Sequence, residues 1–224
     1  MHRPAEAPAA GADVAPPVVL ASRSPRRRAL LELALPPGRL RVLPPRDAAE
    51  EPLTHLTALP DVRAAMRRIT AAKLADVRGQ LEASGEPWAA VVAADTAVLA
   101  GENDALTVLG QPPAGDWEAT THGWFREHYA GKSFRSLTAV AVAAPSGRSA
   151  DAVVSTRVFV RRSAADHVDR IVAAGEPAGR AGGFAITGLA GMLCVKRVEG
   201  GLSNVSGLPL EETLGLLADV GVPV

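Results

Sequence analysis

Two patterns of apolar residues alternate along the chain. Nearly continuous apolar runs, VVLA at 18–21 and WAAVVAADTAVLAG at 88–101, which one acid interrupts, are typical of strands buried on both faces of a sheet. Longer segments repeat their apolar residues every three or four positions, as amphipathic helices do, in the segment that follows Ser24 and at about 62–81. GRLRVLP, residues 38–44, adds a short strand between these helices. The alternation predicts an α/β fold with a mixed, twisted sheet and flanking helices.

The second half of the chain continues the same alternation. A helix is expected at about 117–129, and residues 136–162 read as two strands joined at the turn PSGR. SAADHVDRIVAAG predicts a helix that begins at an N-cap, Ser163. GMLCVKRVEG, residues 191–200, predicts a further strand, and a last helix ends near Ala218.

The turn after the first strand carries an unusual charge pattern. In LASRSPRRRALL, Ser24 is a suitable N-cap and the following proline suits the first helical position. Three arginines then occupy the first helical turn, where the helix dipole disfavours cations. Spacing places Arg26 and Arg27 beside the buried face, while Arg28 can pair with Glu32 in solvent. The turn is a phosphate site, a solvated basic turn or a nucleic-acid patch.

Composition narrows these alternatives. Lys plus Arg and Asp plus Glu both number 24, so no overall positive charge drives the chain toward nucleic acid, and we expect no nucleic-acid partner. The single cysteine, Cys194, lies in an apolar segment and indicates a buried structural thiol. No apolar stretch is long enough to span a membrane, so we expect a cytoplasmic protein without a membrane partner. The Ala/Pro-rich residues 1–16 predict a disordered tail before one domain over 17–224.

Asp95 and Lys73 are the most informative chemical groups. Asp95 follows AVVAA directly and is expected at the carboxyl end of a buried strand, where α/β sheets place ligands and catalytic groups. A buried carboxylate needs a partner such as a metal ion, a water network or an arginine. Lys73 shares the apolar stripe of its helix, so its ammonium either points inward or lies along the edge of a cleft. Glu50 and Glu51 follow the second strand and are a solvated pair or a source of a second metal ligand.

Several motifs in order resemble those of the Maf (septum-formation-inhibitor-like) family of nucleoside triphosphate pyrophosphatases. These are LASRSPRRRALL, TAAKLAD, VVAADTAV, LGQP, YAGKSFRSLTAVAV, GEPAGRAGGFAITGLAG and NVSGLPL, spread over residues 18–217. The resemblance implies an inosine-triphosphatase-like fold with two lobes around a cleft, often in a homodimer. It also implies hydrolysis of dTTP- or UTP-like nucleotides to the monophosphate and pyrophosphate, with Mg²⁺ or Mn²⁺.

The resemblance also assigns roles to individual residues. It makes Asp95 the proton acceptor and a metal ligand, Glu51 the second carboxylate with Glu50 as its rival, and Lys73 a further catalytic residue. The substrate-binding set is Ser22, Ser24, Arg26, Arg27, Thr96, Gln111, Arg180 and Thr187.

This chain departs from the family pattern at four elements. Gln111 replaces the lysine of G-K-P, Gly179 replaces the acid of D-K-A-G, Thr187 replaces the glutamine of I-Q-G, and A-G-K-S-F at 130–134 replaces S-G-R-x-H. Thr96, in contrast, agrees with the pyrimidine-specific members. Three readings therefore stay open: a dTTP/UTP-like substrate, a modified or purine nucleotide, and a nucleotide-binding protein with weak turnover.

Overall fold

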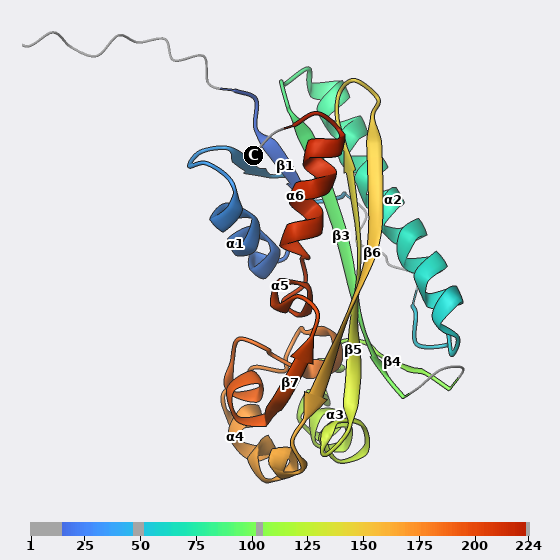
Figure 1. Cartoon of the computed structure of the whole chain (residues 1–224), viewed down its shortest axis with the longest axis vertical. Helices are drawn as coiled ribbons and strands as arrows, with labels where there is room; N and C mark the ends of the chain where they lie inside the picture. The colour runs from blue at the N-terminus through green and yellow to red at the C-terminus, as the bar shows by residue number, and fades with distance from the viewer. Residues whose placement is uncertain (1–14, 47–51, 102–104, 223–224) are drawn as a thin grey trace, which may run out of the picture.

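The computed structural model describes residues 15–46, 52–101 and 105–222. Its strands form one seven-stranded sheet in the order β2-β1-β3-β5-β6-β7, with β4 paired to β3 (Figure 1). Their bounds are β1 Val18–Ala21, β2 Leu40–Val42, β3 Ala90–Ala100, β4 Thr107–Leu109, β5 Ser133–Ala143, β6 Ser149–Val160 and β7 Val195–Glu199. Strands β2, β1 and β3 run parallel, and the remaining pairs are antiparallel. The predicted mixed α/β fold is confirmed.

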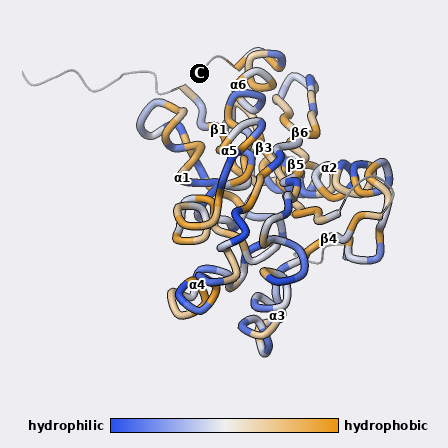
Figure 2. The backbone as a smooth tube through the Cα atoms, turned by 60° about the horizontal axis from the view of Figure 1, so that its bottom comes forward, coloured by the Kyte–Doolittle hydropathy of each residue, from blue (hydrophilic) through white to orange (hydrophobic). Residues whose placement is uncertain are grey.

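Helices cover both faces of the sheet at one end. The α-helices are α1 Pro25–Ala34, α2 Leu59–Ser84, α3 Trp117–Trp124, α4 Val168–Ala173, α5 Leu202–Val205 and α6 Leu210–Asp219. Alternate residues of β1 show the layering, because Leu20 packs with α1 and α6 while Val19 packs with α2. Helix α2 is amphipathic, and its tube alternates between hydrophobic and hydrophilic colours (Figure 2).

A second core fills the other end of the long strands. The rings of Phe125, Tyr129, Phe134 and Phe184 pack with centroid distances of 5.0–6.0 Å, within the range favoured by aromatic pairs. Short helical turns surround this core: η1 Phe125–Tyr129, η2 Arg162–His167, η3 Ala181–Gly183 and η4 Ala190–Cys194. The chain therefore forms two lobes that share β3, β5 and β6 (Figure 1).

Two predicted elements differ from the structure. Residues 162–167 form the 3₁₀ turn η2 and α4 begins only at Val168, so the predicted N-cap at Ser163 is wrong. The predicted strand 191–200 is also too long, because residues 190–194 coil as η4. The Glu176 carboxylate accepts from the backbone N–H of Leu189 and Ala190, and Gly191 N donates to Ala185 O. These contacts favour a closed turn over an extended strand.

Cys194 is fully buried, as predicted, and burial raises the pKa of its thiol to about 11. Because the thiolate is the reactive form, we expect the native chain not to react with a disulfide reagent at pH 8 within minutes. The same chain unfolded in guanidinium should react at its single thiol. Rapid reaction of the native chain would contradict the packing of η4. No described helix is both long and apolar enough to cross a membrane.

Candidate active site

A cleft of about 710 Å³ lies between the two lobes. Its walls come from the β1–α1 loop, α2, β3, the loop after β4, residues 179–187 and residues 205–207. The predicted site residues within the described part of the chain all line it: Ser22, Ser24, Arg26, Arg27, Lys73, Asp95, Thr96, Gln111, Arg180 and Thr187. Glu50 and Glu51 lie outside the described residues.

Asp95 lies within β3, and its predicted place at the end of a strand is wrong. The strand continues to Ala100 because β5 pairs with it along its whole length, with Asp95 opposite Ala139. The parallel neighbour β1 stops at Ala21, opposite Ala93. Asp95 therefore stands just beyond the carboxyl end of β1, where the sheet opens into the cleft, and keeps the position that α/β folds use for ligands.

Lys73 brings its ammonium from α2 to this carboxylate. Lys73 Nζ donates to Asp95 Oδ1 over 2.7 Å, and the two side chains are only 13% and 9% exposed. Of the two orientations open to Lys73, the inward one is realised. Within the described residues Asp95 Oδ2 accepts no hydrogen bond, so this oxygen is available to a water, a metal ion or a substrate.

The β1–α1 loop is ordered by its own hydroxyl groups. Ser24 is the N-cap, as predicted, and its Oγ accepts from Arg27 N over 3.4 Å. Ser24 N in turn donates to the buried Ser22 Oγ over 3.1 Å. The loop thus presents a fixed helix start to the cleft, a geometry suited to phosphate oxygens.

The first two arginines of α1 turn toward the cleft and the third turns away. Arg28 Nε donates to Glu32 Oε1 over 2.8 Å in solvent, as predicted. Burial first, and then the charges of Arg180 and Arg27, lower the pKa of the Arg26 guanidinium. Neither Arg26 nor Arg180 forms an ion pair with a described carboxylate. Such crowding of cations favours binding of a polyanion.

Arg27 joins three segments of the chain. Its Nε donates to Gly207 O over 2.8 Å, its Nη2 to Thr96 Oγ1 over 3.1 Å and its Nη1 to Ser22 Oγ over 3.4 Å. It lines the cleft, as predicted. The guanidinium also fixes the β1–α1 loop against β3 and the 205–207 turn.

Removing this guanidinium should destabilise the chain. Each hydrogen bond to a charged group contributes about 1.5–3 kcal/mol, and buried acceptors would lose their donor. We therefore expect Arg27→Ala to lower the free energy of unfolding by about 3 kcal/mol, measured by urea titration. Arg28→Ala is the matched control and should change it by less than about 0.5 kcal/mol. Equal effects of the two substitutions would contradict the joining role.

Asn204 is a supporting residue that the sequence reasoning missed. It is fully buried, and its Nδ2 donates to Ser136 O over 3.1 Å and to Thr156 Oγ1 over 2.9 Å. The backbone carbonyl oxygen of Asn204 accepts from Thr138 Oγ1 over 3.4 Å and from Gly207 N over 3.0 Å. Asn204 therefore holds the turn that receives Arg27. Its motif, NVSGLPL, was part of the resemblance and carried no assigned role.

The part of the cleft that borders the second core is apolar. Phe134, Phe184, Val98 and Ile186 line it beside the predicted Gln111 and Thr187, a mixture that suits a nucleobase. The sequence reasoning gave these apolar residues no role, because a single aromatic in a strand reads equally well as core.

Tyr129 holds the turn that carries Arg180. Its buried hydroxyl donates to Gly182 O over 2.5 Å, and Gly182 N donates to Gly110 O over 2.8 Å. Gly182 has φ +67°, and a Cβ there would lie 2.6 Å from Tyr129 Oη, so only glycine fits. These contacts tie the Arg180 turn to the loop that bears Gln111.

The side chains that line the cleft show whether it can hold the divalent metal ion that the family resemblance implies. Asp95 is the one carboxylate among the described residues that line the cleft, and the described residues contain no cluster of three or more metal-binding side chains. Mg²⁺ commonly uses one or two carboxylates and completes its shell with waters and phosphate oxygens. The site thus fits a Mg²⁺ or Mn²⁺ ion that is held jointly with a substrate.

The chain is similar to a known family and to several named proteins. The model of the family described as Maf-like protein matches residues 17–220. A dTTP/UTP pyrophosphatase of Brucella abortus (strain 2308) is 36% identical over 209 residues, covering 92% of this chain and 93% of the relative. A dTTP/UTP pyrophosphatase of Caulobacter vibrioides is 36% identical over 207 residues, covering 92% of this chain and 96% of the relative. A solved structure of a nucleoside-triphosphatase / dITP/XTP pyrophosphatase from Mycobacterium abscessus is 14% identical with a TM-score of 0.34. The match covers 65% of this chain and 74% of that one. By its family match and these relatives, the chain belongs to the Maf-like family.

Proposed function

We propose that the chain is a nucleoside triphosphate pyrophosphatase that hydrolyses a dTTP- or UTP-like nucleotide to its monophosphate and pyrophosphate. The observation that carries the proposal is the Asp95–Lys73 pair in a cleft that Arg26 and Arg180 also line. The carboxylate can activate a water and the cations can hold a triphosphate. The relatives named dTTP/UTP pyrophosphatase support the same reaction.

In the proposed reaction Asp95 is the base. Its Oδ2 takes a proton from a water, whose oxygen attacks the α-phosphorus while the bond to the α–β bridging oxygen breaks. The bridging oxygen leaves with pyrophosphate. Lys73 holds Oδ1 and so fixes the direction of Oδ2, and it adds positive charge beside the reacting phosphate.

The cations and the β1–α1 loop position the triphosphate. Arg26 and Arg180 neutralise its phosphate oxygens, and the hydroxyls of Ser22 and Ser24 shape the loop beneath them. Arg27 holds this loop against β3 through its hydrogen bond to Thr96.

A divalent cation would bind between Asp95 and the phosphates, with Glu51 as the second carboxylate that the family resemblance suggests. When bound, such an ion withdraws charge from the phosphate oxygens and stabilises the transition state. Mg²⁺ and Mn²⁺ both meet the oxygen-donor chemistry of the site.

The base-binding end leaves room for a second candidate substrate. Thr187 and Gln111 stand where the family pattern has glutamine and lysine, and Thr187 offers a smaller group than an amide. A modified or purine nucleotide is therefore the alternative substrate for the same reaction. We further propose that residues 17–224 form one catalytic domain, that the chain forms a homodimer and that it is cytoplasmic.

A panel of nucleotides tests the proposal. The chain is incubated with dTTP, UTP, CTP, dATP, GTP and 5-methyl-UTP in Mg²⁺ or Mn²⁺, and pyrophosphate is measured. We expect dTTP and UTP to give the highest kcat/KM. Preference for another base would support the alternative substrate. Thermal stabilisation by nucleotides without any pyrophosphate would overturn the enzymatic proposal and favour a nucleotide-binding protein.

A further inference from the structure

A second hollow, of about 500 Å³, is lined by residues of β5, β6 and β7 and of the segment 127–132. Strand register defines one face of these strands, because Ser133 pairs with Phe159 and Phe159 with Arg197, so their side chains point the same way. Phe134, the next residue, points to the other side and lines the cleft. The second hollow is therefore lined from the opposite side of β5 to the side on which Phe134 lies.

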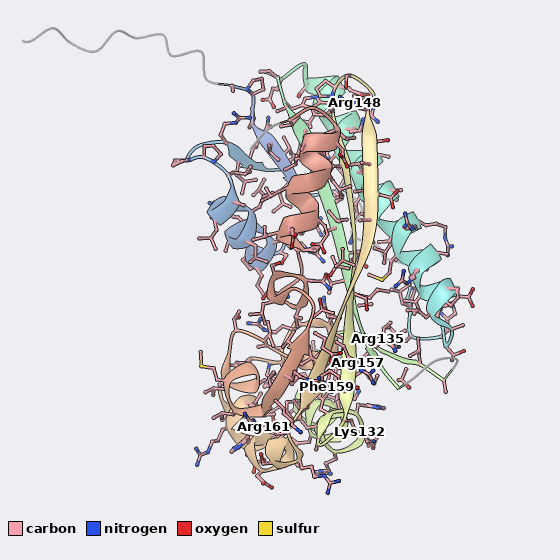
Figure 3. All side chains as sticks on the ribbon, viewed as in Figure 1. Lys132, Arg135, Arg148, Arg157, Phe159 and Arg161 are labelled. Atoms are coloured by element: carbon pink, nitrogen blue, oxygen red, sulfur yellow. The ribbon has the colours of Figure 1, made fainter. Side chains whose placement is uncertain are left out.

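Cations gather on the face of the sheet that carries Ser133 and Phe159. Arg135 lies directly opposite Arg157 across β5 and β6, and like charges in that position destabilise a sheet. Figure 3 shows Lys132, Arg135, Arg157 and Phe159 together on the lower half of these strands, whereas Arg148 lies at the far end. The whole chain has a formal net charge of zero, so this local excess favours an anionic ligand.

Several of these cations are already fixed in place. The Arg197 and Arg157 guanidinium carbons lie 4.0 and 5.1 Å from the Phe159 ring centroid, within cation–π range. Arg157 Nε also donates to Ser133 Oγ over 3.0 Å, and Arg197 pairs with Glu199 over 2.8 Å. The two arginines do not line the hollow themselves, but they border it through Ser133 and Phe159, which do, and they add positive charge at its edge.

Two lysines complete the hollow. Lys132 Nζ donates to Glu127 O and also lines the hollow, and Lys196 lines it from β7. Lys196 is exposed and makes no side-chain hydrogen bond to a described residue. His128 also lines the hollow, and its pKa is lowered, chiefly by burial.

The sequence element at this hollow has no role in the cleft. Residues 130–134, A-G-K-S-F, stand where the family pattern has S-G-R-x-H. Lys132 and Ser133 of this element line the second hollow, and only Phe134 reaches the cleft. The proposed reaction thus leaves the lysine and the serine without a function.

We propose that this hollow is a second binding site for an anion with more than one phosphate group, of the class of inorganic pyrophosphate or a nucleotide's phosphate chain. The choice of phosphate among anions rests on the proposed function, whose substrate and product both carry such groups. Because Arg157 and Arg197 already lie over the Phe159 ring, a nucleobase cannot stack on it. The site should therefore recognise phosphate groups and not the base. UTP and ATP should compete for it equally.

Equilibrium dialysis of the full chain with radiolabelled pyrophosphate tests this proposal. The wild type should show two classes of site. The double variant Lys132→Ala/Lys196→Ala should weaken one class at least about tenfold, and Arg26→Ala should weaken the other. The control Arg63→Ala/Arg170→Ala removes equal charge from positions that line neither hollow and should keep both classes. Competition with unlabelled UTP identifies whether the nucleotide or free pyrophosphate is the better ligand.

Other outcomes would overturn the second site. A single class of site, lost only in Arg26→Ala, would do so, as would a second class that persists in the lysine double variant. Lysine-dependent binding of a uridine 20-mer without pyrophosphate binding would make the face a nucleic-acid surface instead. Lys196→Glu, at one exposed position, gives the same test if the double variant unfolds. These stoichiometries do not depend on hydrolysis, so absence of turnover would not affect them.

Discussion

Replacing Asp95 with asparagine should reduce kcat for pyrophosphate release by about 10²–10⁴-fold, the usual contribution of a positioned general base. The amide keeps the shape of the carboxylate, and its oxygen can still accept from Lys73 Nζ, which lies 2.7 Å from Oδ1. It can neither take the proton of the attacking water nor bind a divalent cation strongly. We therefore expect the chain to fold normally and to bind nucleotide, with the loss confined to the chemical step.

The matched control is Asp116→Asn. Asp116 is exposed before α3 and makes no side-chain hydrogen bond to a described residue. This variant should keep kcat within twofold of the wild type, since its carboxylate lies outside the cleft. An Asp95→Asn variant with wild-type turnover would contradict the assignment of the base.

The second large effect concerns Arg26. We expect Arg26→Ala to lower kcat/KM by about 10²–10³-fold, because the lost guanidinium would neutralise phosphate charge that grows in the transition state. Arg26→Lys should recover part of this loss, since lysine keeps the charge without the planar fork. Initial rates over a range of substrate concentrations separate the effects on kcat and KM.

Arg28→Ala controls for the charge of the same helical turn. Arg28 is bound to Glu32 in solvent, and its side chain is 60% exposed, so we expect kcat/KM to stay within about twofold. Equal losses in the two variants would show that the turn attracts nucleotides through its overall charge alone. The predicted difference instead depends on which side of α1 each arginine occupies.

Local sequence patterns predicted the framework of the site well. Ser24 and Pro25 mark the start of α1, and helical spacing separates Arg26 from Arg28 without any tertiary information. The apolar run around Asp95 placed this carboxylate in the interior, and the stripe that includes Lys73 left its ammonium either inside or at the edge of the cleft. Each of these signals lies within a few residues of the group that it positions.

Contacts between distant segments could not be predicted in this way. Arg27 meets Gly207, 180 residues away along the chain, and Asn204 fixes that turn through β5 and β6. The apolar residues on both sides of Asp95 did predict a strand that continues past it, but its pairing with β5 along the whole length is a long-range contact. The same holds for η4, whose turn is set by Glu176.

Hydrolysis of UTP in ¹⁸O-labelled water tests the central claim most directly. Water attack at the α-phosphorus places the label in UMP and leaves pyrophosphate unlabelled, because the α–β bridging oxygen departs with the leaving group. We predict labelled UMP and unlabelled pyrophosphate, identified by mass spectrometry, and no UDP. Label in pyrophosphate, release of UDP and inorganic phosphate, or no product from any nucleotide of the panel would contradict the account.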